Sequence, residues 1–151
     1  MGSQSAHRVI PKINYYKEKI MKTKIPLWIN ILQVVILAIL SFQTYACYFN
    51  PKLIYPTFEY DATTTQMIYT LAGRDAVMMV ISIIALVRQN PRFYSFAFLM
   101  HSLRELQDMF IAPLTGGGVA VFFVFLIVFV IPEILAYFKL NKMANEMEQA
   151  A

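Results

Sequence analysis

Residues 93–114 read FYSFAFLMHSLRELQDMFIAPL, an apolar stretch that is interrupted by a few strongly polar residues. His101, Arg104, Glu105 and Asp108 fall at positions i, i+3, i+4 and i+7, which confines them to an arc of roughly 100° on a helix. The remaining surface of that helix is suited to contact with lipid. Charges are costly inside a membrane, and they usually face a bundle interior or a water-filled cavity. The pattern therefore predicts a membrane helix whose polar face is turned toward its neighbours.

The rest of the chain is apolar enough to supply those neighbours. Hydrophobic residues make up 58% of the sequence and charged residues only 15%, far from the composition of a soluble domain. Four segments are long enough to span a bilayer as helices: 25–49, 65–87, 93–114 and 117–138. We therefore predict an all-α, polytopic membrane protein in which residues 25–139 form a four-transmembrane-helix bundle. Residues 1–24 are predicted to be a basic segment, either a surface helix or disordered, and residues 140–151 a C-terminal tail.

The loop charges predict how this bundle is oriented. Lysine and arginine gather in three alternate segments, and such segments share the cytoplasmic side. The loop 50–64 carries Lys52 against Glu59 and Asp61, and the turn 115–118 carries no charge. Both termini are therefore predicted to be cytoplasmic, in a plasma or inner membrane. The basic residues of the three segments are Arg8, Lys12, Lys17, Lys19, Lys22 and Lys24, then Arg88 and Arg92, then Lys139 and Lys142.

Several kinds of site are excluded or unsupported. The net charge of +4 comes from the segments that flank the spans, so no nucleic-acid partner is expected. A single cysteine, Cys47, rules out an internal disulfide. No metal site is predicted, because His101 and Cys47 supply too few nitrogen and sulfur ligands. No cofactor is predicted either, since no phosphate-binding or dinucleotide-binding motif is present.

A second pair of charges, Arg74 and Asp75, lies in the segment 65–87. At 1.5 Å per residue, Arg74 lies roughly 14 Å and Arg104 roughly 15 Å from the outer ends of their helices. Gln43 and Asp108 both lie about 9 Å below the outer surface by the same measure. These residues should therefore meet in one layer. Each arginine is predicted to lie within ion-pair reach of a carboxylate, since unpaired charges at that depth are costly.

Three carboxylates against two arginines leave one acidic group without a full partner, which is a candidate proton donor or acceptor. In the functional interpretation, the layer lines a pocket that binds or transforms a small lipophilic molecule by carboxylate acid/base chemistry. Asp108 or Glu105 would then face a cavity of a few hundred Å³, the usual size for small ligands. The catalytic candidates are Asp75, Glu105 and Asp108, and the ligand-binding candidates are Arg74, Arg104, His101 and Gln43.

Two other interpretations stay open. The ion pairs of a non-catalytic membrane subunit would serve assembly only. A proton-coupled carrier is the other alternative, which four short helices could form only as a homo-oligomer. A second, thinner polar layer is also predicted toward the cytoplasmic side, where Asn30, Gln33 and Glu133 lie near the inner helix ends. Pro132 should kink the last helix there and free a carbonyl group.

The stretch Gly73-Arg74-Asp75, followed by Arg88 to Arg92 and then Glu105 to Asp108, resembles small four-helix membrane proteins of the broad DoxX-like group. Some of those proteins carry a similar Arg-Asp pair early in their second helix and an acid late in their third. The resemblance covers roughly residues 65–114. It implies a four-helix bundle and transfers no activity.

Overall fold

The computed structural model describes residues 24–57, 59–114 and 118–149, and these ranges contain helices and no strand. The all-α prediction is confirmed. Nearly all of the predicted basic segment 1–24 lies outside the described residues. The elements are α2 (Leu27–Phe49), η2 (Pro51–Leu53), α3 (Ala62–Arg88), α4 (Pro91–Leu114), α5 (Gly118–Phe125), η3 (Leu126–Val130) and α6 (Ile131–Gln149).

Proline and capping residues set the helix boundaries. Helix α2 ends at Phe49, before the proline that opens η2, since a proline inside a helix would remove a hydrogen bond. Helix α3 begins three residues earlier than predicted, because the Asp61 side chain caps its first turn. At the other end of α3, Gln89 adopts a left-handed conformation with φ of 48°. The chain then enters α4 through Pro91, a residue favoured at a first helical position.

The elements α5, η3 and α6 follow one another without a break from Gly118 to Gln149. Segment η3 is a π-helix that ends two residues before Pro132, where a missing backbone N–H disturbs the regular hydrogen-bond pattern. Helix α6 runs well past residue 138, where the apolar pattern predicted its end. Ala136, Leu140 and Met143 are buried at helical spacing, so packing continues although the solvent-facing side has become polar.

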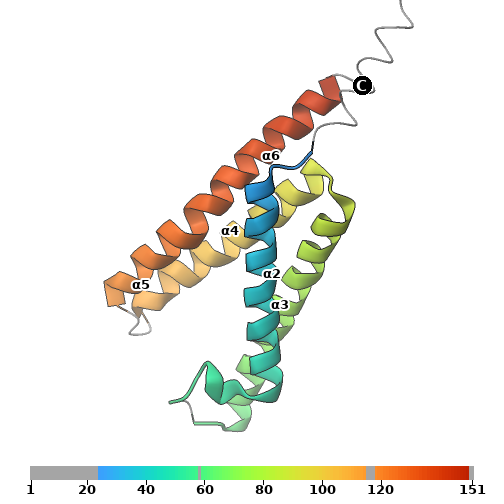
Figure 1. Ribbon diagram of the computed structural model, residues 1–151. Coiled ribbons are helices and arrows are strands. Elements are labelled where there is room, and N and C mark those ends of the chain that lie inside the picture. The colour runs from blue at the N-terminus through green and yellow to red at the C-terminus, as the bar shows by residue number, and fades with distance from the viewer. Residues whose placement is uncertain (1–23, 58, 115–117, 150–151) are drawn as a thin grey trace, which may run out of the picture.

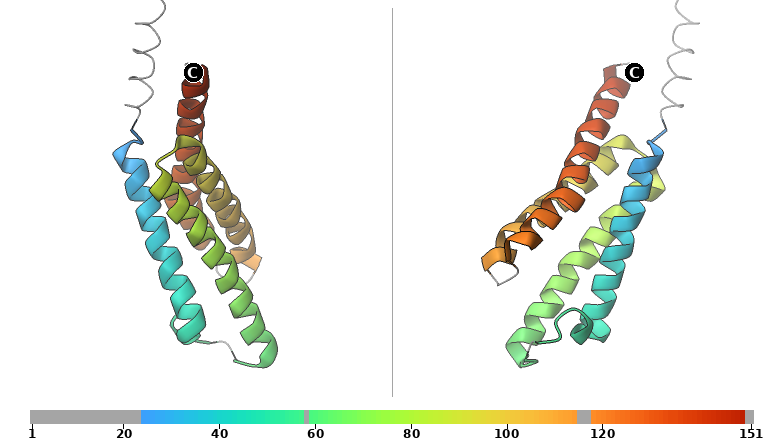
Figure 2. Two further views of the ribbon diagram at one scale, coloured as in Figure 1. Left: turned by 90° about the vertical axis from the view of Figure 1, so that its right-hand side faces the viewer. Right: turned by 60° about the vertical axis from the view of Figure 1, so that its left-hand side comes forward.

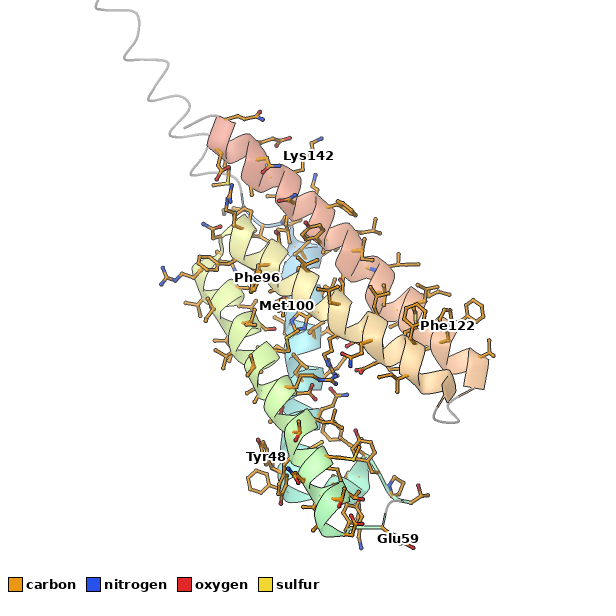
Figure 3. The ribbon with its side chains drawn as sticks, turned by 180° about the vertical axis from the view of Figure 1, so that it is seen from behind. Tyr48, Glu59, Phe96, Met100, Phe122 and Lys142 are labelled. Carbon is orange, nitrogen blue, oxygen red and sulfur yellow. The ribbon has the colours of Figure 1, made fainter. Side chains whose placement is uncertain are left out.

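The helices form two antiparallel pairs, α2 with α3 and α4 with the rod from α5 to α6 (Figure 1). The pairs lie together at the end that holds Arg88, Arg92, Lys139 and Lys142, which we call the basic end. They diverge toward the opposite end, which we call the loop end because residues 50–61 lie there (Figure 2). Figure 3 shows Glu59 at the loop end and Lys142 toward the basic end.

Apolar side chains of all four helical rods meet in one core near the basic end. Its members include Ile29, Leu40, Ala85, Phe98 and Leu140, each completely buried. Apolar side chains also cover the outside: Val87 is 76% exposed and Phe110 is 63% exposed. An apolar exterior around a packed interior is what a bilayer requires.

Among the described residues, three helices are long and apolar enough to cross a membrane: Leu27–Phe49, Ala62–Arg88 and Phe122–Gln149. The chain is therefore that of a multi-pass helical membrane protein. Helix α4 has 24 residues, enough to span, but its charged residues lower its hydropathy. It nevertheless packs against α3, α5, η3 and α6, which makes it the most connected helix of the fold.

The cap of α3 should make its first turn sensitive to acid. The Thr64 backbone N–H donates to Asp61 Oδ1 at 2.7 Å, and this hydrogen bond holds the pKa of the Asp61 carboxyl below its ordinary value. The stabilisation is therefore present above the unfolded-state pKa and is lost as pH falls through the lower folded-state pKa. We expect exchange of the Thr64 amide hydrogen, corrected for its intrinsic pH dependence, to accelerate over that range. Asp61→Asn keeps a capping oxygen but should abolish the pH dependence; an unchanged profile in this variant would refute the assignment.

Candidate functional site

The charged residues predicted to share one layer do meet. Helix α3 supplies Arg74 and Asp75, helix α4 supplies Arg104, Glu105 and Asp108, and these five residues are called the charged cluster below. The amide of Gln43 joins it from α2. The cluster ties together the two helix pairs, because α3 belongs to one pair and α4 to the other.

Arg104 is the centre of the cluster, and its side chain is 9% exposed. Its Nε lies 3.3 Å from Asp75 Oδ1 and 3.8 Å from Asp108 Oδ2, and its Nη1 lies 3.0 Å from Glu105 Oε1. Its Nη2 donates to Gln43 Oε1 at 3.1 Å. One buried guanidinium group therefore faces three carboxylates and one amide, as the planar fork of arginine permits.

Arg74 and Asp108 form the open side of the cluster. The Arg74 Nη1 and Nη2 groups donate to the two Asp108 carboxylate oxygens at 3.4 and 3.3 Å, in a two-point contact. The Arg74 side chain is 32% exposed and that of Asp108 27%, against 6% for Asp75 and 10% for Glu105. The prediction that each arginine pairs with a carboxylate is confirmed, and the structure adds that one pair is accessible and the other is not.

Asp75 lies between the two arginines. Its Oδ1 is 3.3 Å from Arg104 Nε and 3.7 Å from Arg74 Nε, but neither contact has hydrogen-bond geometry. These contacts are electrostatic rather than directional. With all five groups ionised, three carboxylates and two guanidinium groups leave a net charge of −1 on the cluster.

His101 lies on the predicted face of α4 and contacts α3 rather than the carboxylates of the cluster. Its completely buried ring has Nε2 2.8 Å from the Ser82 hydroxyl of α3, which also donates to the Met78 carbonyl. Its Nδ1 has no hydrogen-bond partner among the described residues. His101 thus shares a contact between α3 and α4, and it makes no ion pair with the cluster.

The cavity next to the cluster is smaller than predicted. Glu105 and Arg104 line a space of about 10 Å³ between α2, α4, η3 and α6, room for about one water molecule. Apolar side chains of α2 and η3 narrow the space beside Glu105, and a ligand-sized cavity at Asp108 or Glu105 stays a prediction. A larger cavity, about 410 Å³, lies at the loop end between residues 55–61 and α3, and no residue of the cluster lines it.

Two residues near the cluster were not predicted to belong to it. Glu133, which the sequence predicts in a separate inner layer, lines the small cavity together with Glu105. Tyr55 lies in the loop after η2, close enough to be affected by the cluster. Burial raises the pKa of the Tyr55 phenol, and the carboxylates of Asp75 and Asp108 raise it further. The spacing of residues in the sequence does not indicate that either Glu133 or Tyr55 lies near the charged cluster.

The predicted inner layer is divided. Asn30 accepts hydrogen bonds from the Tyr94 hydroxyl and from the Gln89 side chain, so it fastens α2 to the α3–α4 turn at the basic end. Gln33 is completely buried, and both polar atoms of its side chain lack a hydrogen-bond partner among the described residues.

Within the described residues, no group of three or more His, Cys, Asp or Glu side chains is placed to hold a metal ion.

Comparison with known proteins supplies no relative: no family model, no curated protein and no solved structure matches this chain. The class of this protein is therefore assigned from its fold and its site alone. It is a multi-pass helical membrane protein that carries buried ion pairs, of which Arg104–Asp75 is the most enclosed.

Proposed function

We propose that this chain is a four-span membrane protein, with both termini on the cytoplasmic side, whose charged cluster binds the polar group of a small lipophilic molecule. The fourth span is α4. Its charged residues Arg104 and Glu105 point inward, whereas Phe96 and Leu103 on its other side are 51% and 54% exposed. A helix with this division fits a bilayer in spite of its low mean hydropathy. The proposal also agrees with the resemblance to the DoxX-like group, which implies the bundle alone.

The difference in exposure within the cluster is the observation that carries the binding role. Arg74 and Asp108 are about one third exposed, on the side where the helix pairs diverge, while Asp75, Arg104 and Glu105 are buried behind them. A ligand from the loop end would reach Asp108 first. Because carboxylates outnumber guanidinium groups, the group that best complements the cluster is a cation or a hydrogen-bond donor. Asp108 is then the residue placed to exchange a proton with the bound molecule, and the buried carboxylates set the surrounding charge.

Octylamine is a suitable probe, because it joins a cationic group to a short apolar chain. We expect saturable binding to the full chain in nanodiscs by isothermal titration calorimetry, after subtraction of empty nanodiscs. Asp108→Asn keeps the side-chain shape and removes the charge, so it should abolish the binding. Glu146→Gln removes an exposed carboxylate of α6 and should leave it unchanged.

Octanol, which has the same chain and no charge, tests whether the contact is electrostatic. Equal binding of octanol and octylamine, or equal binding by the wild type and Asp108→Asn, would contradict a role for the cluster in recognition.

The second candidate is a membrane subunit in which the cluster only holds the helices together. The small volume beside Glu105 favours it, since a clamp needs matched charges and no cavity. Under this alternative the wild type binds no amine, while Asp108→Asn remains folded. An oligomeric proton-coupled carrier is the third candidate, and it would need further copies of the chain to complete a path.

A further inference from the structure

A small cavity is lined by two acidic residues from the two members of one helix pair, α4 and α6. Glu105 of α4 and Glu133 of α6 both line the space of about 10 Å³ described above, with Arg104 beside them. The other walls are apolar: Ile36, Ile39 and Leu40 of α2, and Phe129 of η3. A water molecule needs two to four polar partners, and the two carboxyl groups and the guanidinium group supply them.

Glu133 is the less satisfied of the two acids. It is 1% exposed, its Oε2 has no hydrogen-bond partner among the described residues, and it forms no ion pair there. Glu105, by contrast, has Arg104 Nη1 at 3.0 Å. An orphaned carboxyl oxygen in a closed, largely apolar site is costly, and a bound water would satisfy it.

The charges around the cavity favour one protonated carboxyl group there, because the cations are fewer than the carboxylates. Helix α4 brings Arg104 and Glu105, and α3 brings Asp75 and Arg74 behind them. Helix α2 contributes only apolar side chains to the walls, and α6 contributes Glu133. The one adjacent cation is already shared among three carboxylates, so two ionised glutamates facing the cavity would be uncompensated.

We propose that the cavity holds one water molecule and that this water, Glu133 and Glu105 together form a proton-exchange site. Glu133 gives its proton to the water while the water gives one of its own to Glu105. Glu133 becomes a carboxylate, Glu105 becomes a neutral acid, and the water and the total charge are unchanged. The site shares Glu105 with the charged cluster but uses neither Arg74 nor Asp108, so its test below does not depend on whether an amine binds.

The backbone supports this assignment. The π-helix η3 ends one turn before Glu133 and contributes Phe129 to the cavity wall. Single π turns within helices occur frequently at functional sites. On α2, Gln33 lies one turn from Ile36 on the same face, completely buried and unpartnered.

Infrared spectroscopy of the full chain in nanodiscs tests the proposal, because a protonated carboxyl group has its own C=O stretching band. At neutral pH we expect one such band, which shifts on transfer to D₂O. Glu133→Gln should abolish it, while Glu146→Gln, an exposed acid on the same helix, should retain it. Persistence of the band in Glu133→Gln, or its absence from the wild type, would overturn the proposal.

A cavity-filling variant keeps the test valid if Glu133→Gln does not fold. Ile36→Phe leaves every charge in place and occupies the space of the water. We expect it to keep the carboxyl band but to lose the rapid shift in D₂O. Exchange as fast as in the wild type would show that no cavity water carries the proton.

Discussion

Replacing Arg104 with methionine is expected to destabilise the protein by about 3–5 kcal/mol, the cost of removing one partner from a buried ion pair. The substitution leaves Asp75 and Glu105, which are 6% and 10% exposed, without their nearest cation. Arg74 cannot replace it, because its Nε already lies 3.7 Å from Asp75 and its two Nη groups hold Asp108. The measurement is the free energy of unfolding in mixed detergent micelles, with helix content followed by circular dichroism.

Two variants show whether the loss comes from charge or from side-chain volume. Arg74→Met removes a partly exposed guanidinium, whose loss should cost about 1 kcal/mol, as for other solvent-accessible pairs. Adding Glu105→Gln to Arg104→Met removes one of the stranded carboxylates and should recover part of the stability. If the double variant is as unstable as Arg104→Met alone, the charges are not the cause.

The second large effect is expected at Phe98, which is completely buried in the core near the basic end. In lipid the transfer term is small, because lipid tails are as apolar as the protein interior. The cavity and the lost packing remain, so Phe98→Ala should cost roughly 2 kcal/mol or more. Phe98 also stacks on Tyr94 with 6.4 Å between ring centroids, and this contact would be lost.

Phe96 is the matched control, two residues away on the opposite side of α4 and 51% exposed (Figure 3). Phe96→Ala should change the free energy of unfolding in the same micelles only slightly. Equal effects at the two positions would mean that the packed face of α4 has been assigned incorrectly.

The helices and the charged cluster could be predicted because both depend on local spacing. The i, i+3, i+4, i+7 pattern from His101 to Asp108 fixes one helix face, and charge pairing selects Arg74 and Asp75 as its partners. His101 shows where spacing stops being sufficient. Its position on the face was predicted, but its contact with Ser82 depends on how α3 and α4 cross, which no local pattern specifies.

The end of the last helix and the cavity beside Glu105 could not be predicted, because both depend on packing between helices that are distant in the sequence. Polarity predicted that the last helix would end at residue 138, whereas Leu140 and Met143 continue to pack on one side of α6 up to the region where Arg92 pairs with Glu148. Glu133 was placed in an inner layer by its distance from the helix end. The rod from α5 to α6 extends beyond the other helices at the basic end (Figure 1), so distance from the helix end misplaces Glu133, which lies beside Glu105 at the small cavity.

The central claim, a charged cluster inside the membrane that opens toward the loop end, is tested most directly by thiol labelling. Single cysteines would be placed at Glu59, Asp108 and Gln149 in intact cells, with a membrane-impermeant reagent added outside. The native Cys47 is buried and is replaced by alanine to remove background. The account predicts labelling at positions 59 and 108 and none at 149 until the membrane is permeabilised. Labelling at 149 from outside, or none at 108 when 59 reacts, would contradict it.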